Sequence, residues 1–433
     1  MGPTDVEHGS LPTSKSPPEV PPNPLEALQT ASSPKSSSPT APSPNQLDSP
    51  WATVPKGSLS KPPSPELLPP EIVLSAEEQA SAQAYDAVAK AAVEQAQAGI
   101  EIDFGSDTTS ESGSASDAGY ESDSLYSAST SIASSVRDFA FENGRRYHKF
   151  REGSYNFPND PSEQDREDMK HAMMVNLLGG RLHFAPLGEN PGNVLDIGTG
   201  TGIWAIEMGD LYPSANILGI DLSPIQPDWV PPNVNFMVDD AESPWLKPPN
   251  YYDYIHSRHT VMAIRDWPLL MKRALEHLKP GGWMEMQEIH HHPYCHDGSM
   301  PPDHPVSQYW ILIHEALANL GVNFNATLLL EDMMREAGFV NVSKRTFHVP
   351  IGQWPKNKVL KMVGLYWRTI LIDGLQPIAL GPMTRGLKWS KEQVEVWLVE
   401  VRKAYMDGWV HSHMPLHIIC GQKPGGDEPI LTS

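Results

Sequence analysis

The stretch at residues 194–204, VLDIGTGTGIW, constrains the fold more than any other part of the sequence. An apolar run ends in the acid Asp196, passes through three glycines and re-enters an apolar pattern with helical spacing. This order of strand, Gly-rich turn and helix opens a doubly wound α/β sheet. The glycines can adopt backbone angles closed to other residues, which lets a ligand approach the main chain. The first N–H groups of the helix lack internal partners and can bind a carboxylate.

The spacing of the glycines and acids indicates the kind of ligand. The dinucleotide fingerprint G-x-G-x-x-G would need glycine at Ile203, whereas the spacing here is G-x-G-x-G. The next apolar strand, at 217–220, ends in a second acid, Asp221, which suits two ribose hydroxyls. An unphosphorylated nucleoside with an amino-acid tail fits this pattern better than a pyrophosphate. S-adenosylmethionine is such a compound, so we predict it as the cofactor.

Alternating strand and helix patterns continue on both sides of this unit and predict a parallel sheet with right-handed crossovers. The predicted strands end at 196 and 221, or span 234–238, 252–256, 283–289, 341–350 and 413–421; the predicted helices span 161–177, 267–278, 306–320 and 328–337. The first of these helices is predicted to begin with Asp160 as N-cap, proline at its first position and Glu163 as the reciprocal partner of a capping box. Its methionines recur at helical spacing and are predicted to be core residues. Ligands bind such sheets at the carboxyl ends of the strands, near the switch in strand order. The acids Asp196, Asp221 and Asp240 and the end of the strand at 256–258 all fall at this edge.

Composition separates the first third of the chain from the rest. Residues 1–70 hold 18 prolines, and residues 1–135 hold 18 Asp/Glu against 5 Lys/Arg. Such a segment cannot bury enough apolar surface to offset its ordering entropy, so we predict a disordered tail over 1–135. Within the tail, a capping box at Ser75 opens an Ala-rich run to Gln97, interpreted as a transient, solvated helix in preference to a partner-binding one. Serines beside acids at 103–135 suggest a phosphorylated linker.

Charge and cysteine content exclude several classes of protein. Both parts of the chain are acidic, with 35 Asp/Glu against 27 Lys/Arg beyond residue 135, which argues against nucleic-acid binding. Two cysteines, Cys295 and Cys420, imply no disulfide framework. No apolar run approaches the roughly 20 residues that a membrane span needs. We therefore expect a cytoplasmic or nuclear protein.

Five motifs give the sequence a family resemblance. They are ENGRRY at 142–147, YNFPND at 155–160, VLDIGTGTGIW at 194–204, DLSPIQP at 221–227 and LKPGGW at 278–283. With these motifs the chain resembles the class I S-adenosylmethionine-dependent methyltransferases, and within them the fungal LaeA-like methyltransferases of secondary metabolism. The resemblance covers about 142–422. That group includes a nuclear regulator that partners velvet proteins and enzymes of natural-product pathways.

The resemblance implies a Rossmann-like, seven-stranded sheet whose last two strands form an antiparallel edge. The implied segments are a helical, cofactor-covering part at 136–190, the methyltransferase domain at 191–422 and a C-terminal tail at 423–433. A helical lid is expected at about 354–411. It carries six aromatic residues: Trp354, Tyr366, Trp367, Trp389, Trp397 and Trp409. We expect most of them to be core and one or two to contact a planar acceptor.

Methyl transfer from a sulfonium needs alignment of the reactants more than acid–base chemistry. We assign the ribose hydroxyls to Asp221 and the approach of the methionine part to Gly198, Gly200 and Gly202. Asp196 is expected to orient the loop or to meet the methionine amine through water. Asp240 is expected to contact the adenine amino group, with Ala241 leaving room for the ring.

Other candidate residues are less constrained by the pattern. The resemblance implies that Tyr147 and Arg151 fold over the cofactor, although Arg151 could equally pair with Glu152 or Asp160. The stretch EIHHHPYCH at 288–296 lacks the spaced ligand pairs of a metal site, so we expect no metal. His290 and His259 are candidate bases for O-methylation, since an unperturbed imidazole titrates near neutrality.

Three functions compete at this point. The first is methylation of a small natural product, and the second is a regulatory methyltransferase in a velvet-type nuclear assembly that acts on protein or on itself. The third is a module that binds S-adenosylmethionine without turnover.

Overall fold

The computed structural model describes residues 76–103 and 138–425. The predicted disordered stretch 1–75, most of the predicted phosphorylated linker and the end of the predicted C-terminal tail lie outside these residues. Among the described helices, none is both long enough and apolar enough to cross a bilayer.

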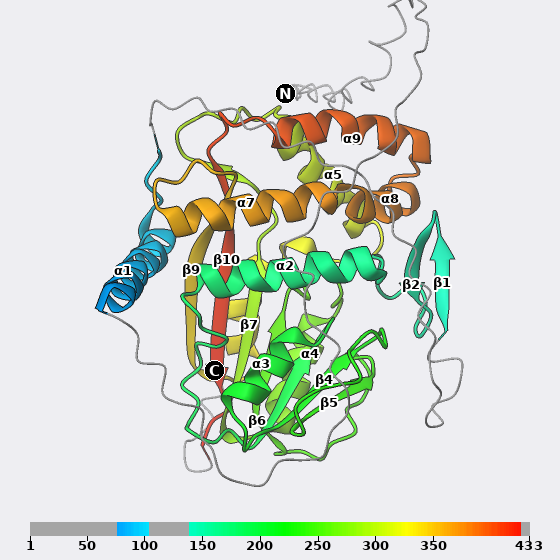
Figure 1. Ribbon diagram of the computed structural model, residues 1–433. Helices are drawn as coiled ribbons and strands as arrows, with labels where there is room; N and C mark the ends of the chain where they lie inside the picture. Colours follow the sequence, from blue (N-terminus) through cyan, green and yellow to red (C-terminus); the bar gives the residue numbers. More distant parts are fainter. Residues whose placement is uncertain (1–75, 104–137, 426–433) are drawn as a thin grey trace, which may run out of the picture. The chain divides into compact units, whose positions relative to one another are not determined.

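A central sheet organises the described chain (Figure 1). Five parallel strands form its first part: β3 (Asn193–Ile197), β4 (Asn216–Asp221), β5 (Val234–Val238), β6 (Tyr252–Arg258) and β7 (Leu278–Ile289). Their order is β5-β4-β3-β6-β7, so the order reverses at β3, the strand that carries the glycine loop. The predicted doubly wound topology is confirmed.

The other edge of the sheet is antiparallel, as the resemblance implies. The long strand β10 (Ser412–Gln422) pairs with β7 on one side and with β9 (Val340–Ile351) on the other. A two-residue strand, β8 (Tyr294–Cys295), pairs with the start of β10 where the pairing with β7 has ended. The predicted seven-stranded sheet is therefore confirmed, and β8 is a short addition to it.

The start of β7 differs from the prediction. The glycines of the LKPGGW motif were expected as a loop before a strand at Trp283, but β7 begins at Leu278. The pairing extends through them because Gly281 N–H donates to the Lys423 carbonyl and Lys423 N–H donates to the Gly282 carbonyl. On its other side β7 pairs with β6, and there the register of the pairing shifts.

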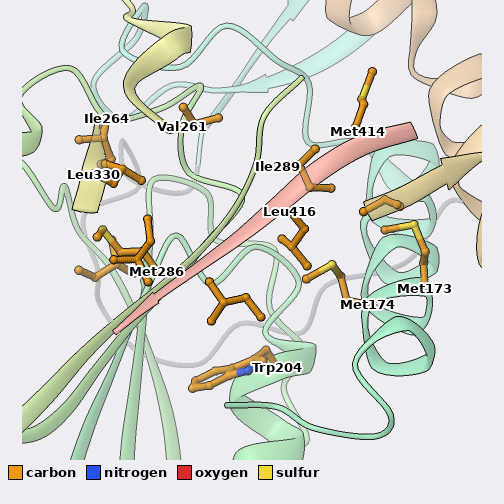
Figure 2. Close-up of a cluster of buried hydrophobic side chains, with 14 of the residues drawn as sticks. Met173, Met174, Trp204, Val261, Ile264, Met286, Ile289, Leu330, Met414 and Leu416 are labelled. Carbon is orange, nitrogen blue, oxygen red and sulfur yellow. The ribbon is translucent and has the colours of Figure 1, made fainter. Parts of the chain in front are cut away.

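Helix α2 (Pro161–Leu177) carries the side chains that face the functional edge of the sheet. It begins as predicted, with Asp160 accepting from the Glu163 N–H and with proline in its first turn. The reciprocal half of the predicted capping box is replaced, because the Glu163 carboxylate pairs with Arg166 instead. Met173 and Met174 of α2 are fully buried in the core that also holds Trp204 of α3 (Ile203–Leu211) (Figure 2). The methionines are core residues, as predicted.

The remaining helices pack around the sheet and α2. They are α4 (Trp267–His277), α5 (Pro305–Ala318) and α6 (Leu330–Glu336), followed by α7 (Lys358–Asp373), α8 (Leu375–Gly386) and α9 (Lys391–Tyr405). The last three form the predicted helical insertion before the final strand. Helix α7 runs alongside α2, so the insertion lies against the helix that carries the cavity side chains (Figure 1). A hairpin of β1 (Phe139–Glu142) and β2 (Arg145–His148) precedes α2.

The Ala-rich helix α1 (Ala76–Ala98) is not the solvated helix that the sequence predicts. Ala92 and Ala96 are fully buried, and α1 packs against β9, α7 and α2. The chain after α1 stays on the domain, because Asp103 N–H donates to the Trp354 carbonyl and Lys356 N–H donates to the Glu101 carbonyl. The small alanine side chains allow α1 to pack closely against the domain. A prediction based on the number of apolar residues in α1 underestimates this packing. Residues 76–103 therefore do not belong to a disordered tail.

Candidate functional site

A cavity opens at the carboxyl ends of β3, β4, β5 and β6, below the polar face of α2. Its empty volume is about 1050 Å³ when the open space at its mouth is included. Each of these four strands leads into a short run of lining residues: 197–198 with 200–201, 220–223, 239–242 and 258–260. The acids that the sequence places at one edge of the sheet are thus brought together at one cavity or beside it.

The three glycines of the loop have different environments. Gly198 and Gly200 line the cavity with φ values of +67° and +56°. A Cβ at Gly200 would project into open space, whereas a Cβ at Gly198 would lie 2.7 Å from Cγ2 of Thr260. Gly202, with φ +84°, is not among the lining residues of this cavity, and a Cβ there would lie 2.4 Å from the Phe236 ring. Its predicted contact with a ligand is corrected to a packing role at the start of α3.

Asp221 is the acid that ties the glycine loop to the cavity. One carboxylate oxygen accepts from the Gly200 N–H at 2.9 Å, and the other accepts from the Ser223 N–H at 2.9 Å. Each oxygen keeps a lone pair for a donor in the cavity. Burial raises the pKa of Asp221 to about 6, although the two N–H donors act in the opposite direction.

Asp196 is turned away from the main cavity and organises the loop. Its Oδ2 accepts from the Thr199 hydroxyl at 2.6 Å, and its Oδ1 accepts from Nδ1 of His256 at 2.8 Å. The His256 ring stacks on Trp204 at 3.6 Å between centroids, and both residues are buried. Asp196 borders a smaller recess beside the cavity. Of its two predicted roles, this geometry corresponds to orientation of the loop.

Asp240 and Ala241 line the cavity after β5. Asp240 accepts from the Glu242 N–H at 2.9 Å and from the Ser243 hydroxyl at 3.1 Å. Arg151 lies at the rim, with Nε 3.6 Å from Asp240 Oδ2 and Nη2 donating to the Ser243 hydroxyl at 3.0 Å. Arg151 therefore pairs with a lining residue, and not with Glu152 or Asp160.

Tyr147 is placed differently from the prediction. It lies on β2 opposite Ala140 and is not one of the residues that line the cavity. Tyr155 takes its place in the lining, with its ring edge-on to Phe157 at 5.1 Å. Its motif, YNFPND, was recognised in the sequence, but the direction of its first side chain was not.

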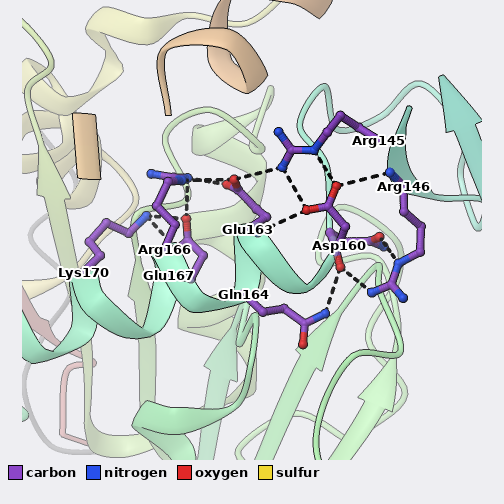
Figure 3. A network of polar contacts seen from close by, with 9 residues as sticks. Arg145, Arg146, Asp160, Glu163, Gln164, Arg166, Glu167 and Lys170 are labelled. Atoms are coloured by element: carbon purple, nitrogen blue, oxygen red, sulfur yellow. Dashed lines mark hydrogen bonds and ion pairs between the residues drawn. The ribbon is translucent and has the colours of Figure 1, made fainter. Parts of the chain in front are cut away.

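Charged side chains along α2 form a network of ion pairs (Figure 3), and several of them line the cavity. Arg166 pairs with Glu163 and Glu167, and Lys170 pairs with Glu167 at 2.6 Å. The lining members of α2 are Glu163, Gln164, Glu167 and Lys170. Sequence reasoning missed them, although positions 163, 167 and 170 share one face of a helix.

Arg258 is a second cation that the sequence reasoning left without a role. It ends β6, lines both the cavity and the smaller recess, and has Nη2 2.8 Å from Nδ1 of His171. Burial lowers the pKa of Arg258, while the surrounding carboxylates raise it. Arg258 and Lys170 together provide positive charge where the recess meets the N-terminus of α3.

The two candidate bases, His259 and His290, lie in different places relative to the cavity. His259 lines the cavity, and its ring nitrogens have no hydrogen-bond partner among the described residues. Burial, together with the cations Lys170 and Arg258, holds the pKa of His259 well below its usual value, so its imidazole is neutral. His290 lies beyond the end of β7, where its N–H donates to the Pro415 carbonyl and its ring contacts Tyr294. It is not part of the cavity lining, so the structure does not bring it to the site.

The comparisons with known proteins agree with this geometry. A family model described as a methyltransferase domain matches residues 166–344. Methyltransferase pytC of Aspergillus terreus is 42% identical over 299 residues, which cover 69% of this chain and 92% of that protein. The chain belongs to the class I S-adenosylmethionine-dependent methyltransferases.

Other relatives of this methyltransferase carry regulatory or protein-directed names. Secondary metabolism regulator LAE1 of Cochliobolus heterostrophus is 35% identical over 289 residues, covering 65% of this chain and 94% of that protein. Protein-methionine methyltransferase laeA of Emericella nidulans is 33% identical over 291 residues, which cover 66% of this chain and 77% of that protein. The predicted resemblance to LaeA-like methyltransferases of fungal secondary metabolism is confirmed.

The residues of the cavity fit the cofactor of this methyltransferase family. The cavity is open beside Gly200, and a Cβ at this position would take up space that a ligand could fill. Asp221 presents carboxylate lone pairs beside it, and the cations near the N-terminus of α3 suit an amino-acid carboxylate. Among the described residues, no group of three or more His, Cys, Asp or Glu side chains is arranged to hold a metal ion.

The six aromatic residues of the helical insertion lie outside the lining of the cavity of this methyltransferase. Within the described chain, none of the six lines the cavity. Trp367 is fully buried in the core, and Trp409 is 83% exposed. The insertion approaches the site through α2, against which α7 packs, and through Arg385 of α8, which donates to the Asn156 carbonyl at 3.4 Å. The expected direct contact of one or two aromatics with an acceptor stays a prediction.

Proposed function

We propose that this methyltransferase transfers a methyl group to a protic oxygen or nitrogen of a small-molecule acceptor in fungal secondary metabolism. The observation that carries the proposal is His259, a neutral imidazole in the cavity wall with both nitrogens unpartnered among the described residues. A free imidazole is useful when the acceptor must lose a proton. The 42% identity to methyltransferase pytC supports an enzyme of this kind.

The residues of the cavity divide the work. Asp221 binds the ribose hydroxyls, Asp240 and Ala241 hold the adenine, and Gly198 and Gly200 let the methionine part approach the main chain. When bound, S-adenosylmethionine supplies a methyl group on a sulfonium, an excellent leaving group. Alignment of acceptor and methyl is then the main requirement, and orientation of this kind can contribute roughly 7–11 kcal/mol.

In this proposal His259 carries out the remaining step, which is removal of the acceptor proton. It takes the proton from the acceptor hydroxyl or amine as the new bond to carbon forms. Its pKa is held low by burial and by Lys170, which keeps the imidazole unprotonated and available at neutral pH. Tyr155 and Gln164, which also line the cavity, provide polar contacts for such an acceptor.

A second candidate is methylation of protein methionine, because one relative, 33% identical, bears that name. This second candidate would have a velvet-type partner and a nuclear location. Methylation of a small molecule, the first candidate, is compatible with a cytosolic or a nuclear location. A thioether has no proton to lose, so a base in the cavity would serve no purpose. Dependence of turnover on His259 thus separates the two candidates.

The test uses S-adenosylmethionine with a labelled methyl group, incubated with the purified full chain and with small-molecule and protein fractions of fungal cells. The proposal predicts label in one or a few small molecules, loss of label with Asp221→Ala, and a fall of at least tenfold with His259→Ala. Label confined to protein, unaffected by His259→Ala, would contradict it and support the second candidate. Tagging the protein in cells then decides its location.

A further inference from the structure

The turn that carries His259 is held in an unusual backbone conformation. His259 has φ +57°, in the left-handed region that is uncommon for residues other than glycine. Its N–H donates to the Gln287 carbonyl at 3.1 Å. Immediately after it, the N–H groups of Ala263 and Ile264 donate to the Thr260 carbonyl at 2.8 and 3.1 Å. A single helical turn therefore begins at Thr260, and its first N–H groups have no partner within the turn.

Glu288, near the end of β7, provides those partners. One oxygen accepts from the N–H and from the hydroxyl of Thr260, both at 2.8 Å. The other oxygen accepts from the Val261 N–H at 3.2 Å. The Ser257 hydroxyl lies 2.6 Å from the Thr260 hydroxyl and completes the group. Glu288 thus accepts three hydrogen bonds from two consecutive residues of the turn.

The carboxyl of Glu288 is fully buried and is not one of the cavity residues. Burial raises its pKa to about 7, and the donors of the turn together with Lys170 oppose that rise. A buried carboxyl that lies outside the cavity and only accepts from a neighbouring turn has no part in binding a ligand. Its contacts fix the backbone on the C-terminal side of His259, while the bond to Gln287 fixes the N-terminal side.

Holding a non-glycine residue at positive φ costs about 1–3 kcal/mol, and such a conformation persists only when the surroundings determine it. We infer that Glu288 is a positioning residue that pins the turn at 259–261 and so directs the His259 imidazole into the cavity. This inference rests on the proposed function of His259. It assigns Glu288 an effect on turnover and little effect on cofactor binding, because its hydrogen bonds go to Thr260 and Val261 and none goes to Asp221 or to the glycine loop.

The matched control is Glu285, on the same strand. It is also fully buried: one oxygen accepts from the Phe184 and Ala185 N–H groups at 2.8 and 2.7 Å, and the other accepts from the Gln287 side-chain amide at 2.8 Å. Glu288→Gln and Glu285→Gln each replace one acceptor oxygen by an amide that cannot accept from N–H. Both variants change a buried carboxylate on the same strand, but only Glu288 accepts hydrogen bonds from the turn of His259.

The experiment measures kcat, acceptor KM and S-adenosylmethionine affinity for the full chain with both variants. Glu288→Gln should lower kcat by about 10- to 100-fold, the effect of a small misplacement of a reacting group. Cofactor affinity should stay within about twofold. Glu285→Gln should lower thermal stability with kcat within about threefold of the parent. Wild-type kcat in Glu288→Gln, or an equal loss in both variants, would overturn the inference.

A double variant gives the decisive readout, because residues that act as a unit have non-additive effects. In a His259→Ala background, adding Glu288→Gln should change kcat by less than about twofold. A further tenfold loss would mean that Glu288 acts independently of His259 and would refute its positioning role. If Glu288→Gln does not fold, Glu288→Asp, which keeps both acceptor oxygens but withdraws them from the turn by one methylene, replaces it in the same cycle.

Two failures are distinguishable in this design. Full turnover by His259→Ala removes the base from the proposed function and this inference with it. A slow His259→Ala beside a fully active, folded Glu288→Gln refutes only the role of Glu288. The response of Asp221→Ala tests the cofactor site separately from both.

Discussion

Replacing Asp221 by asparagine removes one acceptor oxygen at the centre of the proposed cofactor site. The two carboxylate oxygens accept from the Gly200 and Ser223 N–H groups, each at 2.9 Å, and each has a lone pair left for a ribose hydroxyl. Asparagine keeps one oxygen and turns an N–H₂ group toward the other backbone N–H. The amide cannot satisfy both backbone donors and both ribose hydroxyls.

The magnitude follows from the number of bonds lost. A hydrogen bond to a charged group contributes about 1.5–3 kcal/mol, and asparagine loses one of the two that the ribose makes. At about 1.4 kcal/mol per factor of ten, the affinity for S-adenosylmethionine should fall by roughly 10- to 100-fold.

The same carboxyl determines how the effect varies with pH. Its pKa is raised to about 6 from an ordinary 3.8, so the folded protein binds this proton more tightly than the unfolded chain does. Stability from this group is therefore fully present below about pH 4 and is lost as the pH rises through 6, by at most about 3 kcal/mol. Hydroxyl donors from the cofactor favour the carboxylate, so affinity should increase between pH 5 and 7. Asp221→Asn should lack both dependences.

Isothermal titration calorimetry with S-adenosylmethionine measures the affinity, and thermal unfolding of the ligand-free protein at pH 5 and pH 7 measures the stability. Asp239→Asn is the matched control, because Asp239 lines the same cavity and accepts from the Asp240 N–H at 2.8 Å. It should lose less than about fivefold in affinity. An Asp221→Asn protein that binds within threefold of the parent would refute the assignment of Asp221 to the ribose.

Four further substitutions test the loop, the rim and the docked helix. Gly200→Ala places a methyl in the open cavity at φ +56° and should lower cofactor affinity at least tenfold, with a stability loss of about 1–2 kcal/mol. Gly202→Ala, at φ +84° and against an aromatic ring, should cost more than about 2 kcal/mol in thermal unfolding; a stable variant would contradict the packing role. Arg151→Ala removes a half-exposed pairing with Asp240 and should change stability by less than about 0.5 kcal/mol while raising the cofactor KM a few-fold; a larger stability loss would show that the rim contact is structural. Ala92→Arg puts a charge at a fully buried position of α1 and should lower the Tm by at least about 4 °C, whereas an unchanged Tm would mean that α1 is not docked.

Local patterns were enough to predict most of the sheet. The strand at 234–238 was predicted with the bounds that β5 has, and Asp160 was predicted as the N-cap of α2. These features depend on hydrogen bonds and side-chain alternation within a few residues. The prediction of β7 was five residues short, because the pairing of its glycines depends on Lys423, which is more than 140 positions away in the chain.

The directions of side chains at the site were harder to predict. Tyr147 and Tyr155 both lie in recognised motifs, yet only Tyr155 lines the cavity. His259 and His290 both follow a strand, but the turn after β6 enters the cavity while the chain after β7 continues along β10. Which way a chain leaves a strand is set by its neighbours in the sheet, and these neighbours come from distant parts of the sequence.

The sequence by itself determined the alternation of strands and helices, the glycine loop and the acids at strand ends, since each depends on residues close together in the chain. Only the tertiary structure decided that α1 packs on the domain, because its buried alanines gain their stability from β9 and α7, about 250 residues later. It also decided that α2 supplies charges to the cavity and that Glu288 meets the turn of His259. Contacts of this kind form when packing brings separate segments within a few ångströms, and no local pattern records them.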